Sequence, residues 1–261
     1  MPKEVYCASL DPNKKINGNG IKILRKSGIK VEVGILKKQA VEMNKDFFFK
    51  HNNDKPYVRV KIAQTIDGKI ALKDGKSKWI TSKEARKNVQ LLRIQNDAVL
   101  IGSNTLVKDN PRLNIRDIKV FKQPMSIVLG STLSAKKNMN IFKDNKKVIF
   151  ANNYEKTELN QNFTNNLSFI KLTKKNSLND LLKKLSKYDL NSILVEGGSK
   201  IFTSFISKNL ADEIIFFISP KFLGKDSIDA LSLKSPLSIA NAKNYTIDST
   251  EMVGEDIKLV L

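Results

Sequence analysis

One turn in this sequence combines an acid with two glycines. It reads Glu196-Gly197-Gly198-Ser199 and lies between an apolar run that ends at Val195 and an apolar helix pattern over Ile201 to Ile206. Paired glycines let a backbone approach a ligand closely, and the free amides at a helix N-terminus attract a phosphate. A carboxylate at the end of a buried strand costs solvation free energy unless it has a partner. The turn therefore predicts an anion-binding site with an acid beside it, although Gly-Gly before a helix is also an ordinary connection.

Two arginines and a tryptophan add binding chemistry. Arg93 and Arg116 carry guanidinium groups, which can bind a phosphate through two parallel hydrogen bonds, although either could instead form a surface ion pair. Trp79 is the only tryptophan, and it could pack in the core or stack on a nicotinamide or a base. A site of amides, arginine, lysine and threonine with few acid–base groups favours hydride transfer, because a bound cofactor brings the reactivity.

Several other chemistries find no support in the residues. The single cysteine, Cys7, and the single histidine, His51, are poor material for a zinc site or for a Ser/His/Asp or Cys/His set. Neither a metal nor covalent acyl catalysis is therefore expected. Gly18 and Gly20 lack the third glycine of a dinucleotide fingerprint, and no Gly-x-x-x-x-Gly-Lys-Ser/Thr loop occurs.

The charge and hydropathy of the chain limit its partners. The formal net charge is +20, but the lysines are dispersed and no stacking aromatic residues lie between them, so we expect no nucleic-acid function. The charge still favours anionic substrates, including nucleotides. No run of 18 apolar residues and no apolar secretory signal occur, so we expect a cytoplasmic protein without a membrane span.

The elements that must position these residues begin with a strand and a helix. Val58, Val60 and Ile62 alternate with Arg59, Lys61 and Ala63, which predicts a strand. Thr81-Ser82-Lys83-Glu84 matches a capping box in which Thr81 accepts from an N-terminal amide. A helix is predicted after it, and Ala98 to Ile101 predicts a buried strand.

The rest of the chain alternates between strand and helix patterns. A helix is predicted over 179–187, and further strands are predicted over 126–129, 148–151, 169–172, 193–195 and 214–218, with a closing antiparallel pair over 245–248 and 257–261. Strands that alternate with helices favour an α/β fold, a mostly parallel sheet covered on both faces with an antiparallel edge.

The first 53 residues are interpreted as a separate small unit. A helix over 21–26, a strand over 31–33 and one helix over 36–48 are predicted there. The unit is too small and has too few apolar residues to form a stable fold alone. The polar run from His51 to Pro56 predicts the boundary with a second unit, residues 54–261.

The motifs of the second unit resemble one enzyme family. They are the run from Lys61 to Arg116, the Glu196-Gly197-Gly198 turn and Pro220-Lys221-Phe222-Leu223-Gly224. Over residues 57–261 the chain resembles the reductase half of the bifunctional riboflavin-biosynthesis deaminase/reductase. The resemblance implies a dihydrofolate-reductase-like three-layer sandwich. It also implies a homodimer and NADPH-dependent reduction of 5-amino-6-(5-phosphoribosylamino)uracil to the ribitylamino compound.

The resemblance assigns roles to individual residues. Cofactor contacts are implied for Ala63, Trp79, Thr105, Asp109, Ser131, Gly197, Gly198 and Ser199. Substrate contacts are implied for Ser77, Arg93, Leu113, Arg116 and Glu196, with the arginines on the 5-phosphate. Lys61 and Glu196 are the predicted catalytic residues, and Lys61 would assist opening of the sugar ring.

Residues 1–53 resemble the last portion of the deaminase domain of the same family, on the evidence of Asp11-Pro12-Asn13 and Asn44-x-x-Phe47-Phe48. The His-x-Glu and Pro-Cys…Cys motifs of a zinc deaminase do not occur. The chain thus looks like a shortened bifunctional protein, and we expect no deaminase activity.

Two other functions stay open at this point. One is a reductase of a pterin or a related ring on the same scaffold, against which the two arginines argue because they suit a phosphate. The other is a basic nucleic-acid-binding protein that uses the net charge.

Overall fold

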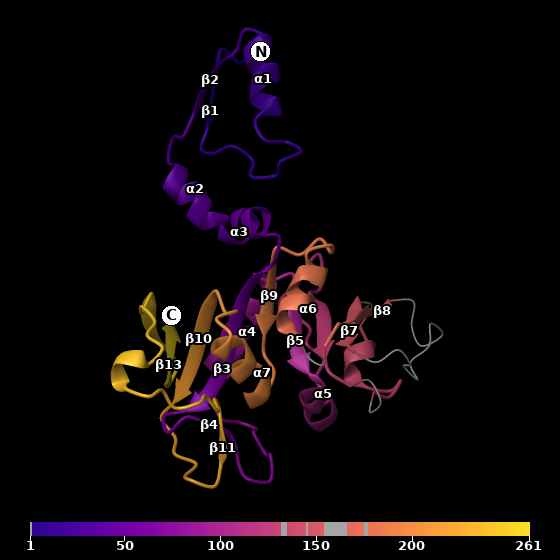
Figure 1. The fold of residues 1–261 in the computed structure, drawn as a ribbon, viewed down its shortest axis with the longest axis vertical. Helices are drawn as coiled ribbons and strands as arrows, with labels where there is room; N and C mark the ends of the chain where they lie inside the picture. Colours follow the sequence, from indigo (N-terminus) through magenta and orange to yellow (C-terminus); the bar gives the residue numbers. More distant parts are fainter. Residues whose placement is uncertain (1, 132–134, 145, 154–165, 175–176) are drawn as a thin grey trace.

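The computed structural model describes residues 2–131, 135–144, 146–153, 166–174 and 177–261. Within these ranges a nine-stranded sheet dominates, in the order β12-β13-β10-β3-β9-β5-β6-β7-β8 (Figure 1). The strands are β1 (Glu4–Cys7), β2 (Lys30–Val33), β3 (Tyr57–Thr65), β4 (Lys69–Ala71), β5 (Ala98–Gly102), β6 (Met125–Leu129), β7 (Val148–Asn152), β8 (Leu167–Lys171), β9 (Ser192–Val195), β10 (Glu213–Ser219), β11 (Ile228–Asp229), β12 (Ser249–Val253) and β13 (Asp256–Val260). The helices are α1 (Asn19–Lys26), α2 (Lys37–Met43), α3 (Lys45–Asn53), α4 (Lys83–Ile94), α5 (Ser103–Asp109), α6 (Leu178–Leu185) and α7 (Ser199–Ser207), with short 3₁₀ turns at η1 (Asn140–Phe142) and η2 (Ile239–Asn241).

The predicted α/β class with a mostly parallel sheet is confirmed. Every pairing from β10 through β3, β9, β5, β6 and β7 to β8 is parallel, and only β12 and β13 add antiparallel pairs. The predicted strand over 245–248 is wrong, because the closing hairpin pairs Ser249–Val253 with Asp256–Val260. Gly254 has a left-handed φ of 65° and forms the tight turn that joins the two strands of this hairpin.

Helices cover both faces of the sheet. On one face, Leu181 of α6 and Phe205 of α7 belong to the same buried core cluster as Val60 of the central strand β3. On the other face, α4 packs Leu92 against β9 and β10, and α5 packs Leu106 against β5 and β6. Each helix contributes one apolar stripe, as expected for a three-layer arrangement.

The start of α4 differs from its predicted cap. Ser82, rather than Thr81, accepts the hydrogen bond, from the amide of Ala85 (3.1 Å). The helix begins one residue later than predicted because the Asp256 carboxylate accepts from the Ser82 amide (2.7 Å), which fixes Ser82 in an extended conformation.

The first 53 residues form a small unit that projects beyond one end of the large sheet (Figure 1). Its strands β1 and β2 pair in parallel, and β1 was not predicted. The single helix predicted over 36–48 is wrong, because Asn44 has a φ of −121° and separates α2 from α3. The Asn44 side chain also donates to the Ala40 carbonyl (2.9 Å), which ends α2.

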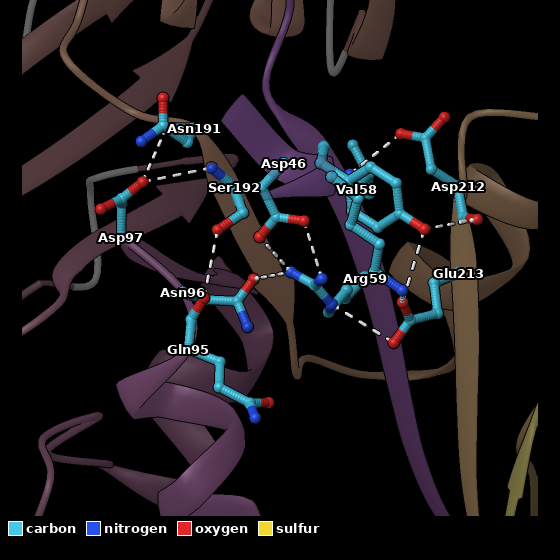
Figure 2. Close-up of polar contacts among 12 residues, drawn as sticks. Asp46, Val58, Arg59, Gln95, Asn96, Asp97, Asn191, Ser192, Asp212 and Glu213 are labelled. Atoms are coloured by element: carbon cyan, nitrogen blue, oxygen red, sulfur yellow. Dashed lines mark hydrogen bonds and ion pairs between the residues drawn. The ribbon is translucent and has the colours of Figure 1, made fainter. Parts of the chain in front are cut away.

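A buried ion cluster joins this unit to the amino ends of the large sheet's strands (Figure 2). Arg59 of β3 donates to both carboxylate oxygens of Asp46 in α3 (2.6 and 2.7 Å) and to Glu213 of β10 (3.3 Å). Its third partner residue is Asn96, after α4, whose side-chain oxygen accepts from Arg59 (3.3 Å). A buried guanidinium needs such partners, so the cluster fixes α3 against the sheet.

Candidate active site

A cavity of about 510 Å³ opens at the carboxyl ends of β3, β5, β6 and β9, where ligands commonly bind in parallel sheets. The hairpin strands β4 and β11 and the first turns of α5 and α7 complete its walls. The predicted site residues that line it are Lys61, Ala63, Ser77, Trp79, Thr105, Asp109, Glu196, Gly197, Gly198 and Ser199. These predicted residues come from four separate stretches of the chain and share one cavity.

The double-glycine turn packs too closely for any side chain. A Cβ on Gly197 would lie 2.6 Å from the Ile101 Cα, and one on Gly198 would lie 3.1 Å from the Thr105 hydroxyl oxygen. Gly198 also has a left-handed φ of 80°, which favours glycine. No side chain caps the N-terminus of α7, so its first amides face the cavity rim without a competing side-chain acceptor. This turn fits an anionic phosphate group.

Glu196 is held by Arg93 in a two-point ion pair. The Arg93 Nε donates to one carboxylate oxygen (2.7 Å) and its Nη2 to the other (2.8 Å), and both side chains are about nine-tenths buried. Burial opposes ionisation, but the charge and hydrogen bonds of Arg93, with Lys61 and Lys146 nearby, lower the pKa of Glu196 to about 2. Glu196 is therefore a fixed anion at neutral pH.

Lys61 is the cation that faces the cavity from the floor of the sheet. Its ammonium makes no hydrogen bond within the described residues. Burial lowers the pKa of Lys61, the Glu196 charge opposes this effect, and the Arg93 charge adds to it. An amine of this kind exchanges a proton more readily than an exposed lysine.

A second buried lysine lies behind the ion pair. Lys146 is 5% exposed, and its ammonium donates to the Arg112 carbonyl. Burial lowers the pKa of Lys146 to about 8, with smaller effects from Asp144, Arg93, Glu196 and Arg112. Lys61, Arg93 and Lys146 thus surround the single Glu196 carboxylate, which leaves a positive local charge for an anionic ligand.

Four predicted site residues do not line the cavity. Leu113 is buried in the core, Ser131 follows β6, and the Arg116 side chain is exposed on the loop after α5. Arg93 lies behind Glu196, where its Nη1 also donates to the Asn114 carbonyl (2.8 Å). Their ligand contacts stay predictions.

Side chains from other elements hold the loop that carries Arg116. Gln90 accepts from the Arg116 amide (3.0 Å), and Gln123 bonds both the amide and the carbonyl of Ile115 (2.7 and 3.1 Å). Arg93 and Lys146 hold the carbonyls of Asn114 and Arg112. The loop therefore has a defined path without belonging to a helix or strand.

Several residues of the site carry little or no signal in the sequence and were not predicted. Arg86 lines the cavity seven positions before Arg93, on the same face of α4, and that spacing could have identified it. Lys108 and Lys200 also line the cavity. No comparable spacing distinguishes Lys146, because it lies in a lysine-rich run of the sequence.

Asp109 is the second acid of the cavity. Partial burial raises its pKa above the ordinary value, although Lys78 and Lys108 act in the opposite direction. It is thus the acid that most readily holds a proton here. Across the described ranges, no three His, Cys, Asp or Glu side chains form a group that could hold a metal ion. None of the helices there is long and apolar enough to cross a membrane.

The chain is similar to known proteins over most of its length. The family described as RibD C-terminal domain matches residues 56–259. The Riboflavin biosynthesis protein RibD of Aquifex aeolicus is 36% identical over 98% of this chain and 71% of its own length, and that of Buchnera aphidicola is 35% identical over 98% and 73%. Among solved structures, RibD of Acinetobacter baumannii (form 2) has a TM-score of 0.89 at 28% identity, over 99% of this chain and 72% of the other. A Thermotoga maritima protein titled diaminohydroxyphosphoribosylaminopyrimidine deaminase/5-amino-6-(5-phosphoribosylamino)uracil reductase has a TM-score of 0.85 at 31% identity, over 99% and 70%.

Proposed function

The chain belongs to the RibD C-terminal domain family, and we infer from this membership that its cavity is the active site of a pyrimidine reductase of riboflavin biosynthesis. The observation that carries the inference is the common cavity at the sheet edge. There, the double-glycine turn of Gly197 and Gly198, the Arg93–Glu196 ion pair and Lys61 meet. We propose the substrate named for the Thermotoga relative, 5-amino-6-(5-phosphoribosylamino)uracil.

The residues at the cavity rim fit NADPH as the reductant. The close-packed turn of Gly197 and Gly198 and the uncapped start of α7 suit its phosphates, and Trp79 offers a flat surface for a ring. Thr105 and Asp109 border the same space. When bound, the cofactor supplies a hydride.

We propose that Lys61 and Glu196, which both line the cavity, assist the sugar chemistry. Opening the ribose ring moves a proton to the ring oxygen and leaves a carbon–nitrogen double bond. Reduction then adds a hydride to that carbon and a proton to the nitrogen. We assign Lys61 to the proton transfer at the ring oxygen, because its lowered pKa makes its proton available. Asp109, whose pKa is raised, is our candidate source of the proton for the nitrogen.

The arginines receive different roles. Arg116, exposed on the loop between α5 and β6, is proposed to bind the 5-phosphate of the substrate. Arg93 is proposed to act through Glu196 and through the Asn114 carbonyl, because those partners already take three of its donors. This refines the expectation that both guanidiniums bind the phosphate directly.

Further expectations from the sequence stay proposals. We propose that residues 1–53 are the remnant of a deaminase domain without zinc-dependent activity, and that residues 54–261 are the reductase domain. Release of ammonia from the deaminase substrate by the purified chain would contradict the first part. A homodimer and a cytoplasmic location are also proposed, and native mass spectrometry would test the dimer.

The decisive test is an anaerobic absorbance trace of NADPH mixed with the phosphoribosylaminouracil. We expect NADPH oxidation with this pyrimidine and none with dihydrofolate, and the reverse preference would favour a pterin reductase. Lys61→Met should abolish turnover while Lys258→Met, on β13 and outside the cavity lining, should retain it. Salt-sensitive retention on DNA without NADPH protection against thermal unfolding would instead favour a nucleic-acid-binding protein.

A further inference from the structure

Trp79 lies on an irregular segment between β4 and α4, and it is 64% exposed although it lines the cavity. A large ring on such a segment has few packing partners to fix it. Without other contacts it would sample several rotamers and would form a poorly defined wall.

A lysine from the loop after β10 holds the backbone of this segment. The Lys221 ammonium donates to the carbonyls of Trp79 (3.0 Å) and Ile80 (2.8 Å). Lys221 itself follows β10, and its own loop is fixed because the Asp67 carboxylate accepts from the amides of Leu223 (3.1 Å) and Gly224 (2.8 Å). Lys221 thus connects the two carbonyls to a loop whose own backbone is held by Asp67.

An arginine of α4 holds the ring and the next carbonyl. The Arg86 guanidinium lies 4.3 Å from the centre of the Trp79 ring, within the range of a cation–π contact. Its Nη1 also donates to the Thr81 carbonyl (2.6 Å). Arg86 and Lys221 therefore hold three successive carbonyls and one aromatic ring, from two different elements.

We propose that Arg86 and Lys221 are positioning residues that hold Trp79 as a wall of the reductase cavity. Arg86 stacks on the ring and Lys221 fixes the backbone, so that the ring presents a preformed surface to the cofactor. The part of this proposal that concerns the cofactor rests on the proposed function. Pre-organisation of this kind lowers the ordering cost of binding, so the two residues act on cofactor affinity more than on the chemical step.

Trp79 is the only tryptophan of the chain, so its fluorescence reports on this wall alone. Steady-state anisotropy and acrylamide quenching should be measured on the ligand-free protein, first for Lys221→Met, which keeps the apolar stem but removes the donor. We expect lower anisotropy and stronger quenching than in the unmodified protein. Lys225→Met, an exposed lysine four positions along the same loop, is the matched control and should change neither.

Cofactor kinetics provide the second readout. Lys221→Met and Arg86→Met should raise the KM for NADPH about fivefold, which corresponds to the roughly 1 kcal/mol of a typical hydrogen bond, with little change in kcat. Lys221→Arg should restore most of the anisotropy and of the KM, because its guanidinium can donate to both carbonyls.

The anisotropy comparison decides the positioning role by itself. Ligand-free anisotropy and quenching equal to the unmodified protein in both Lys221→Met and Arg86→Met would overturn it, whatever the kinetics. If the unmodified protein oxidises no NADPH, the proposed function fails, and the anisotropy comparison still shows whether Lys221 and Arg86 hold Trp79.

Discussion

Replacing Glu196 with glutamine should destabilise the protein through the loss of one buried charge. Glutamine keeps the shape of the side chain but leaves the Arg93 guanidinium without a counter-charge. The pKa of Glu196 falls from 4.5 to about 2 in the folded protein, a difference of about 2.5 units. At 1.36 kcal/mol per unit this corresponds to about 3 kcal/mol of stability. Breaking a buried ion pair typically costs about 3–5 kcal/mol, so the two arguments agree.

The sign of the pH dependence follows from the direction of the shift. A carboxyl whose pKa is lowered by folding stabilises the protein fully above pH 4.5 and loses this effect as the pH falls toward about 2. The difference between the unmodified protein and Glu196→Gln should therefore stay constant from about pH 7 to about pH 5.

Urea denaturation followed by far-UV circular dichroism would measure these free energies. Glu251→Gln is the matched control, because Glu251 pairs with Lys258 (2.8 Å) on the exposed edge strand, and its loss should cost about 0.5 kcal/mol or less. Arg93→Met and the double variant complete a cycle, in which the double variant should lose less than the sum of the single variants.

Two results would refute this reasoning. One is an unfolding free energy of Glu196→Gln within about 0.5 kcal/mol of the unmodified protein, which would mean that the ion pair contributes nothing. The other is a difference that does not shrink as the pH falls from 4.5 toward about 2, which would mean that folding does not lower the pKa of Glu196. In kinetics, Glu196→Gln should reduce turnover more than NADPH affinity, and equal losses would indicate a purely structural carboxylate.

Three further predictions concern the ion cluster, the buried lysine and the substrate loop. Asp46→Asn should lower the unfolding free energy by about 3 kcal/mol in denaturation experiments, because it removes the closer of the two carboxylates that pair with the buried Arg59 guanidinium, while the exposed Glu42→Gln should have almost no effect. Folding lowers the pKa of Lys146 from 10.5 to about 8, so stability should rise with pH between these values, and a stability–pH profile of Lys146→Met should lack that rise. Arg116→Ala should raise the KM for the pyrimidine about tenfold or more with NADPH KM unchanged, and the nearby Lys119→Ala should leave both constants as they are.

Local patterns in the sequence were sufficient for the regular elements of the site. The apolar runs before Gly102 and Glu196 predicted β5 and β9, and the strands end where residues of the cavity begin. The Gly197-Gly198 turn was predicted as an anion site from residue types alone. These features depend on the chemistry of neighbouring residues, which a single sequence shows directly.

Contacts between distant residues were not predictable in the same way. Nothing near Arg93 in the sequence indicates that Glu196, 103 positions later, is its partner. Arg93 therefore looked like a free phosphate ligand. The path of the loop up to Arg116 was equally hidden, because side chains such as Gln90 and Gln123 hold it rather than a repeating backbone pattern.

The central strand shows why alternation alone is misleading here. Arg59, Lys61 and Ala63 share one face of β3, and the charges of Arg59 and Lys61 suggest an exposed face. That face is instead covered by α4, since Ala63 packs in the same cluster as Leu92. Its two cations, Arg59 and Lys61, lie two positions apart and belong to different clusters.

Each end of this buried polar face has its own function. At the amino end, Arg59 binds Asp46 and Glu213 and fixes the first unit. At the carboxyl end, Lys61 faces the cavity beside the Arg93–Glu196 pair. Because α4 supplies Arg93 and is followed by Asn96, it contacts both clusters and sets their spacing. A substitution that shifts α4 along the sheet should therefore disturb the attachment of the first unit and the active-site ion pair together.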